Sequence, residues 1–216
     1  MNNKEENYTP IHLHTTYGSI GDSIIKIDEL IKRAKELNIS SLAVTNHGSM
    51  TDIYDFYFEC KKENIKPLLG CEIYTVEDVT VKDKKNKRCN HLILIAINNT
   101  GLKNLLSILA ISELEFKYYK PRIDLTNLEK MNTEGLVCTT ACVGSHINQL
   151  IIQDRILEAK EEVIRLNNIF EYFFLEIQPG DFDEVIKTNK QLIEFHKELN
   201  IPLIASNDIH YLYKED

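Results

Sequence analysis

Residues 42–74 read LAVTNHGSMTDIYDFYFECKKENIKPLLGCEIY and contain the pattern of a strand, a helix and a second strand. The first strand is expected at Leu42–Thr45 and the second at Pro67–Tyr74, because both runs are short, apolar and rich in aliphatic residues. Asp52–Asn64, between them, has the spacing of an amphipathic helix. This order predicts two parallel strands joined by a crossover helix.

The same alternation continues on both sides of this segment. The strand-like runs are Ile11–His14, Leu42–Thr45, Pro67–Tyr74, Leu92–Ile97, Leu136–Thr140, Phe173–Ile177 and Pro202–Ser206. The helix-like segments are Ile27–Leu37, Asp52–Asn64, Leu102–Glu113, Ile147–Gln153, Leu157–Ile169 and Phe182–Leu199. Helix ends and tight turns are expected at Asn38, Asn64 and Asn200. Seven strands alternating with helices predict a mainly parallel α/β sheet, either open and doubly wound or closed into a barrel.

The barrel is the favoured layout. No GxGxxG or GxxxxGK[ST] loop follows the first strand, so the usual nucleotide sites of open sheets are missing. Polar residues at the strand ends fit the mouth of a (β/α) barrel instead. Residues 1–216 fit one domain, with residues 76–90 as an excursion from the barrel.

Composition excludes several other classes of protein. The chain has 43% hydrophobic and 27% charged residues, which is typical of a soluble globular protein. Its first residues, MNNKEENY, do not resemble a leader, and no run approaches the ~18 apolar residues of a membrane helix. The sequence therefore predicts a cytoplasmic protein without a membrane partner. Its five cysteines are an odd number and form no CxxC pair, so we expect free thiols or metal ligands.

The net charge of −8 argues against a broadly basic nucleic-acid surface. Contact with nucleic acid would need a local patch, and two segments qualify: Val81–Arg88 (VKDKKNKR) and Lys117–Arg122 (KYYKPR). The first is also typical of a solvated loop.

Metal-ligating side chains collect near the ends of the predicted strands. His12 and His14 are two apart on the first strand, so both imidazoles point the same way. Asp208 and His210 repeat this spacing after the last strand. The complete set of candidate ligands is His12, His14, Asp22, His47, Glu72, His91, Cys142, Asp208 and His210. His91 precedes its apolar run, so either that strand runs in an unusual direction or its predicted boundary is wrong.

These side chains point to a metal cluster rather than to isolated polar residues. Imidazole, carboxylate and thiolate suit zinc, iron or manganese. A lone histidine is usually a satisfied core or surface residue. So many ionisable groups at one barrel mouth would be costly to bury without cations.

Six motifs in order resemble the PHP (polymerase and histidinol phosphatase) family, over almost the whole chain. They are IHLHTTY, AVTNHG, IKPLLGCEIY, HLILIAINN, YYKPRID and IPLIASNDIHYL. They are most similar to the PHP domain that opens the alpha subunit of bacterial DNA polymerase III.

The resemblance implies a distorted (β/α)7 barrel that holds up to three divalent metal ions (Zn, Mn or Fe). By this analogy, the first ion is held by His12, His14, Glu72 and Asp208. Glu72 bridges to a second ion with His91 and Cys142, and Asp22, His47 and His210 hold the third.

The chain departs from the family pattern at three places. Asn46 in TNHG stands where the family usually has Asp, which predicts a weaker anchor for His47 and reduced activity. The segment Tyr17–Asp22 is one residue longer than the polymerase pattern, so the assignment of Asp22 is less certain than its neighbours'. His146 replaces an acidic residue and is expected either to face solvent or to add a ligand.

The function implied is metal-dependent hydrolysis of a phosphate ester, at the 3′ end of DNA or on a nucleotide. Arg122 and Lys120 are predicted to clamp the substrate phosphate, although KPR also fits a surface turn. Tyr118 or Tyr119 would stack on a base or pack in the core.

Three alternatives stay open: a structural module that supports a polymerase and docks a proofreading exonuclease or other replisome proteins, a small-molecule phosphatase of the histidinol phosphatase type, and a module that removes pyrophosphate. DNA synthesis is not expected from these residues alone, and the chain is either free-standing or the opening part of a longer polymerase.

Overall fold

The computed structural model describes residues 8–83 and 88–216. Its strands are β1 (His12–Leu13), β2 (Ser41–Val44), β3 (Lys66–Thr75), β4 (Asn90–Ala96), β5 (Arg122–Ile123), β6 (Leu136–Thr139), β7 (Tyr172–Ile177), β8 (Leu203–Ala205) and β9 (Asp208–Ile209). Its helices are α1 (Ile27–Glu36), α2 (Ile53–Lys62), α3 (Asn99–Leu114), α4 (Leu125–Leu128), α5 (His146–Ile152), α6 (Ile156–Ile169) and α7 (Asp183–Leu199).

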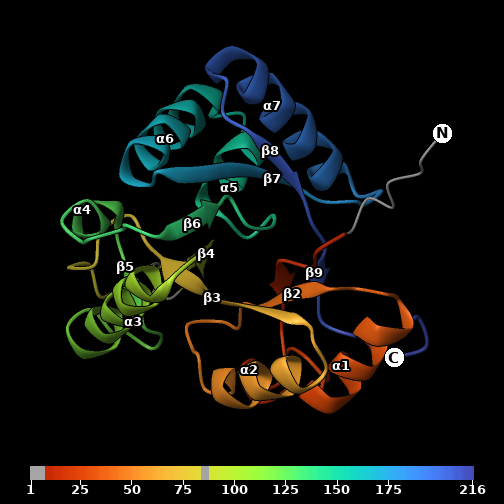
Figure 1. Cartoon of the computed structure of the whole chain (residues 1–216). Coiled ribbons are helices and arrows are strands. Elements are labelled where there is room, and N and C mark those ends of the chain that lie inside the picture. The colour runs from red at the N-terminus through yellow and green to blue at the C-terminus, as the bar shows by residue number, and fades with distance from the viewer. Residues whose placement is uncertain (1–7, 84–87) are drawn as a thin grey trace.

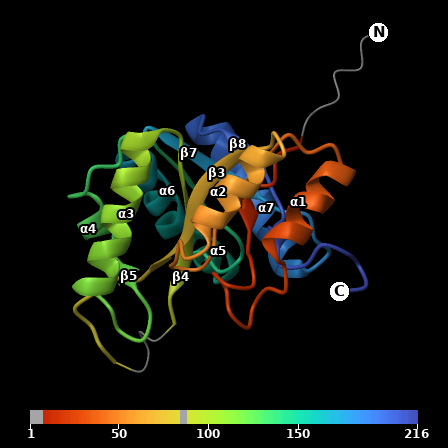
Figure 2. The same cartoon turned by 60° about the horizontal axis from the view of Figure 1, so that its bottom comes forward.

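The main sheet is curled and carries its helices on the outside (Figure 1). Its strand order is β2-β3-β4-β6-β7-β8, with β5 paired to the end of β3. In the turned view, α2 lies in front of β3, and α3 stands to its left (Figure 2). The expected distorted α/β barrel is confirmed in this form.

A separate parallel ladder of β1 and β9 accompanies the main sheet. Backbone hydrogen bonds tie the β1 segment to β2: the amide of Ala43 donates to the Pro10 carbonyl (2.7 Å) and that of Thr45 to the Leu13 carbonyl (2.9 Å). Since β9 follows β8 within a few residues, this ladder lies between the two edges of the curled sheet.

The strand β4 runs antiparallel to both of its neighbours, β3 and β6, whereas the other pairs are parallel. The beginning of β4 therefore lies at the same rim as the ends of β3 and β6. This reversal accounts for the position of His91 ahead of its apolar run. The expected boundary was also wrong, because β4 begins at Asn90 rather than Leu92 and contains His91.

Alternating residues divide the core into an outer and an inner layer. On β4, Leu92 and Leu94 pack outward in the cluster shared with α3, α5, α6 and α7. Ile93 and Ile95 face inward, with Ala43 of β2, in a smaller apolar cluster. The cluster formed by β1, β2, α1 and α2 is a third one. The inner cluster supports the polar site described below.

Most predicted elements are found within a few residues of their expected bounds, with two differences. The run Pro202–Ser206 was expected to lead directly to Asp208, but β8 ends at Ala205 and Asp208–Ile209 forms the separate β9. The short β5 and α4 were not predicted, because two- and four-residue elements carry no periodic pattern. Asn38, Asn64 and Asn200 adopt left-handed φ angles of 55°, 58° and 55° at the predicted helix ends.

Within the described residues, no helix is both long and apolar enough to span a bilayer. Part of the basic segment Val81–Arg88, namely residues 84–87, lies outside the described residues, as do residues 1–7.

Candidate metal centre

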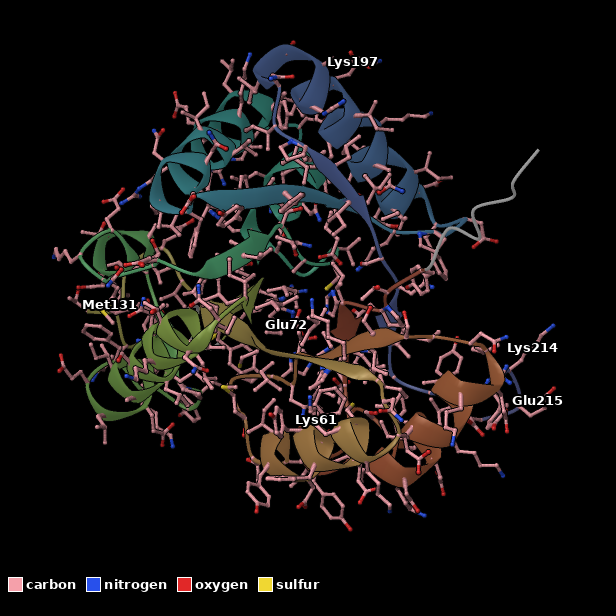
Figure 3. The ribbon with its side chains drawn as sticks, viewed as in Figure 1. Lys61, Glu72, Met131, Lys197, Lys214 and Glu215 are labelled. Carbon is pink, nitrogen blue, oxygen red and sulfur yellow. The ribbon has the colours of Figure 1, made fainter. Side chains whose placement is uncertain are left out.

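Glu72 on β3 is the hub of a cluster of histidines. It is fully buried and lies near the middle of the molecule, while Lys197 and Lys214 lie at its periphery (Figure 3). Its Oε1 lies 3.4 Å from His12 Nε2 and 2.9 Å from His91 Nδ1. Its Oε2 lies 3.3 Å from His14 Nε2 and 2.7 Å from His47 Nδ1. One carboxylate thus faces four imidazoles contributed by three other parts of the chain.

The β1–β9 ladder supplies the first group of candidate ligands. Its register places Asp208 opposite His12. Asp208 Oδ1 lies 3.2 Å from His12 Nε2 and 3.3 Å from His14 Nε2. These three side chains each offer a ligand atom to one point, with Glu72 adjacent.

Asp22 and His210 extend the cluster toward solvent. Asp22 Oδ2 lies 2.8 Å from His47 Nε2 and 3.4 Å from His210 Nδ1. His210 Nε2 lies 2.9 Å from Asp208 Oδ1, which joins this edge to the first group. The Asp22 side chain is 50% exposed, so the cluster opens to solvent on this side.

His91 and Cys142 complete the cluster from β4 and from the loop after β6. Cys142 Sγ lies 3.9 Å from both Glu72 Oε1 and His91 Nδ1. Ala141, just before the cysteine, has a φ of 52°, a left-handed conformation that non-glycine residues rarely adopt. This turn directs the Cys142 thiol toward the carboxylate. All nine candidate ligands predicted from the sequence are therefore in one cluster.

The arrangement of these donor atoms fits metal ions better than it fits mutual hydrogen bonding. Among the residues that the structure describes, four buried atoms of the cluster have no partner in hydrogen-bond geometry: His12 Nε2, His14 Nε2, His47 Nδ1 and Glu72 Oε2. Unpartnered buried polar atoms are rare and need an explanation. Metal bonds of about 2.0–2.3 Å in tetrahedral geometry place ligand atoms roughly 3.3–3.8 Å apart. The separations of 3.2–3.4 Å that join His12 and His14 to Glu72 and Asp208 are close to this range.

The pKa shifts of the carboxylates also favour cations. Burial alone raises the pKa of Glu72, but the charge of His12 and the close imidazole nitrogens of His12, His47 and His91 hold this pKa well below its usual range. Burial likewise opposes ionisation of Asp208, and its contacts with His14 and His210 lower its pKa strongly. The lowered pKa of both carboxylates favours the ionised form, which is the form that binds metal.

Glu176, at the end of β7, belongs to the site but was missed in the sequence. It is buried, and its Oε1 lies 2.9 Å from Nδ1 of His12. A ligand histidine whose second nitrogen contacts a carboxylate is a common arrangement in metal sites. Glu176 also accepts hydrogen bonds from Thr139, Ser206 and Gln178 (2.8 Å from Gln178 Nε2). Its place near the end of an apolar strand was an available signal.

The two predicted phosphate-clamping residues lie in different environments. Lys120 is exposed and its Nζ lies 4.1 Å from the centre of the Tyr74 ring, which stacks on His47 at a centroid distance of 5.7 Å. Gly48 permits this packing, because a Cβ there would lie 3.0 Å from Tyr74 and Pro121. Lys120 therefore borders the cluster.

Arg122 does not reach the cluster. It is fully buried and donates to the carbonyls of Phe116 (3.2 Å), Val79 (3.1 Å) and Val81 (3.0 Å). The expectation that it clamps a substrate phosphate is therefore not supported, because its guanidinium holds backbone segments together.

The remaining predicted residues are not part of the cluster. Tyr118 packs under the Arg122 guanidinium at 4.9 Å, and Tyr119 is exposed. His146 is outside the cluster: its Nδ1 lies 2.5 Å from Glu162 and its Nε2 3.4 Å from Glu77. His146 is thus paired rather than a metal ligand or a solvated side chain.

The chain is similar to part of a much longer replication protein. It is 41% identical to the DNA polymerase III subunit alpha of Borreliella burgdorferi over 210 residues, which are 95% of this chain and 18% of that protein. It is 38% identical to the same subunit of Aquifex aeolicus over 224 residues, with 98% and 19% covered. The chain spans about a fifth of the length of these relatives.

Solved structures share the fold at low sequence identity. A candidate metal-dependent phosphoesterase from Bifidobacterium adolescentis has a TM-score of 0.64 at 14% identity, covering 96% of this chain and 89% of that one. An amidohydrolase from Chromobacterium violaceum, with sulfate and no metal, has a TM-score of 0.58 at 13% identity, covering 94% and 87%. The family model of the PHP domain matches residues 10–180. The family model covers most of the chain, and the match to the polymerase subunits covers nearly all of it. The chain therefore belongs to the PHP domain family.

Proposed function

We propose that the chain is a metal-dependent phosphoesterase with up to three divalent ions. The observation that carries this proposal is that buried ligand atoms of His12, His14, His47 and Glu72, which have no hydrogen-bond partner, lie together in one cluster. Zinc, manganese and iron all suit this mixture of imidazole, carboxylate and thiolate donors.

The nine ligands divide into three groups around Glu72. His12, His14 and Asp208 with Glu72 would hold one ion, and Glu72, His91 and Cys142 a second. Asp22, His47 and His210, at the open edge, would hold a third. Such ions lower the pKa of a water molecule and neutralise charge on phosphate oxygens.

The residues around this centre would bind and orient a phosphate ester. Lys120 is exposed beside His47 and can approach a phosphate that enters from the Asp22 side. A polar cavity of about 550 Å³ borders His91 and includes Arg88, Arg155 and Glu77 in its lining. Its two arginines could bind a neighbouring phosphate of a longer substrate.

The substrate we propose is nucleic acid or a nucleotide, with the 3′ end of DNA as the first choice and hence a proofreading type of exonuclease. This choice rests on the relatives, which are named as subunits of a DNA polymerase. The same relatives suggest a cytoplasmic location and replication proteins as partners.

Metal analysis and hydrolysis assays test this function together. The purified chain should contain more than one equivalent of metal and cleave bis-p-nitrophenyl phosphate and primed DNA. His210→Ala should lose turnover, whereas His196→Ala should keep it, because His196 lies on α7 and contacts the Ile201 carbonyl. Less than one equivalent of metal with no cleavage of either substrate would refute the proposal.

A second candidate is a structural role inside a polymerase, favoured by the match to a fifth of the length of those subunits. In this case the metals stabilise the domain, and the domain supports the polymerase or docks a separate exonuclease. Asp208→Ala and His210→Ala would then lower the melting temperature, and the unmodified chain would show no turnover to lose.

A further inference from the structure

Asn46, which replaces the aspartate usual in the family, is the centre of a buried hydrogen-bond network. It is 1% exposed and lies directly before His47. Its Nδ2 donates to Asp52 Oδ1 (2.8 Å), and its Oδ1 accepts from the backbone amide of Thr15 (2.7 Å). Gly18 packs against it so closely that a Cβ there would lie 1.9 Å from Asn46 Nδ2.

These partners fix the orientation of the Asn46 amide. An ionised carboxylate only accepts hydrogen bonds, so the NH2 group must face Asp52. A backbone amide only donates, so the carbonyl oxygen must face Thr15. The substitution Asn46→Asp would instead present a second carboxylate to the carboxylate of Asp52.

The fixed position of Asn46 Oδ1 determines the direction in which the Ser19 hydroxyl donates its proton. Ser19 Oγ lies 3.2 Å from Asn46 Oδ1 and 3.1 Å from His14 Nδ1. A hydroxyl has one proton, so if Ser19 donates it to Asn46, Ser19 must accept from His14. His14 then carries its proton on Nδ1 and has a free lone pair on Nε2, the atom that faces Glu72 and Asp208 without a hydrogen bond.

We propose that Asn46, held by Asp52, is a positioning residue that acts through Ser19 to keep His14 in the tautomer able to bind metal at Nε2. In this pair Asp52 supplies the carboxylate and Asn46 supplies the donor. The inference rests on the proposed metal centre but not on hydrolysis.

Exchanging the side chains of Asn46 and Asp52 tests whether this pair supports metal binding. Asn46→Asp should weaken Mn²⁺ binding roughly ten- to hundredfold and lower the melting temperature. Combining Asn46→Asp with Asp52→Asn should restore Mn²⁺ affinity to within about threefold of the original, because one donor and one carboxylate face each other again. A combined variant as weak as Asn46→Asp, or an Asn46→Asp variant with unchanged affinity, would overturn the proposal.

The tautomer of His14 gives an independent readout. Imidazole ¹⁵N spectra of the zinc-loaded full chain should show the His14 proton on Nδ1. Ser19→Ala should disturb this signature and weaken Mn²⁺ binding, while Ser112→Ala should change neither, since the Ser112 hydroxyl donates to the Ile108 carbonyl within α3. A proton on His14 Nε2 in the unsubstituted chain refutes the inference even if the variants do not fold. A chain that binds zinc with the proton on His14 Nδ1 but cleaves no phosphate ester would refute the proposed function alone.

Discussion

Glu176→Gln removes one negative charge next to the proposed metal centre with little change of shape. Glu176 Oε1 accepts from His12 Nδ1 (2.9 Å) and Gln178 Nε2 (2.8 Å), and Oε2 accepts from Thr139. A glutamine can keep its carbonyl oxygen at the Oε1 position and turn its NH2 group toward the Thr139 hydroxyl, which can accept. Of the donors named here, only the Thr139 hydroxyl loses its acceptor, and it gains the glutamine NH2 as a donor instead, so the variant should fold.

The Glu176→Gln variant is expected to bind metal more weakly. The Glu176 carboxylate makes His12 more basic and balances the positive charge of the ion, and loss of such a partner weakens metal binding roughly tenfold or more. Tenfold corresponds to about 1.4 kcal/mol. At saturating metal the stabilisation by binding falls by the same amount, which lowers the metal-induced gain in melting temperature by about 3–6 °C for a domain of this size.

Titration of the metal-free chain with Mn²⁺ and parallel thermal melts measure both quantities. Glu162→Gln is the matched control, because that carboxylate also contacts a histidine, His146, but lies outside the cluster. The reasoning is refuted if Glu176→Gln binds Mn²⁺ as tightly as the original chain and shows the same metal-induced gain.

Three further predictions concern residues outside the ligand set. Arg122→Met should lower stability by about 3 kcal/mol, or roughly 6–12 °C in melting temperature, because three backbone carbonyls lose their donor, while metal content measured by mass spectrometry stays unchanged. Lys120→Ala should raise KM several-fold in phosphodiester hydrolysis and leave the metal content and melting temperature unaltered. The hydrogen bond with Glu162 raises the pKa of His146, so this pair stabilises the fold below the ordinary histidine pKa of about 6.5, and the contribution is lost as pH rises through the raised value. His146→Gln should therefore lower the melting temperature by about 2–4 °C near pH 5.5 and by less near pH 9; an equal loss at both would contradict the assignment.

The sequence predicted side-chain positions correctly wherever residue spacing alone determines the direction in which side chains point. His12 and His14 are two apart on a strand, so their shared face followed from strand geometry. The apolar runs and the helical spacing located most of the elements for the same reason. Spacing could not determine the direction of β4, because a single sequence does not show which strand runs antiparallel to its neighbours. The only indication was His91, which comes before its apolar run instead of after it.

Other features depend on distant parts of the chain and could not be predicted from local patterns. Arg122 lies in a KPR turn that suggests an exposed cation, but carbonyls of residues 79 and 81 enclose its guanidinium. Asp52 reads as an ordinary first residue of a helix, and only the folded chain shows that it faces Asn46. Asp208 forms its own short strand because β1 is available to pair with it.

The pairing of β1 with β9 has a consequence for the biogenesis of the protein. Only two residues on each side make this ladder, yet they join parts of the chain separated by almost its entire length. Contacts of such long range form late, because closing a large loop costs entropy before any contact repays it. The ribosome must release the Asp208 region before it can join His12 and His14 in the proposed metal centre. Ion binding at that centre would therefore be the last step that joins β1 to β9, and depletion of metal during synthesis should leave this ladder open to proteases.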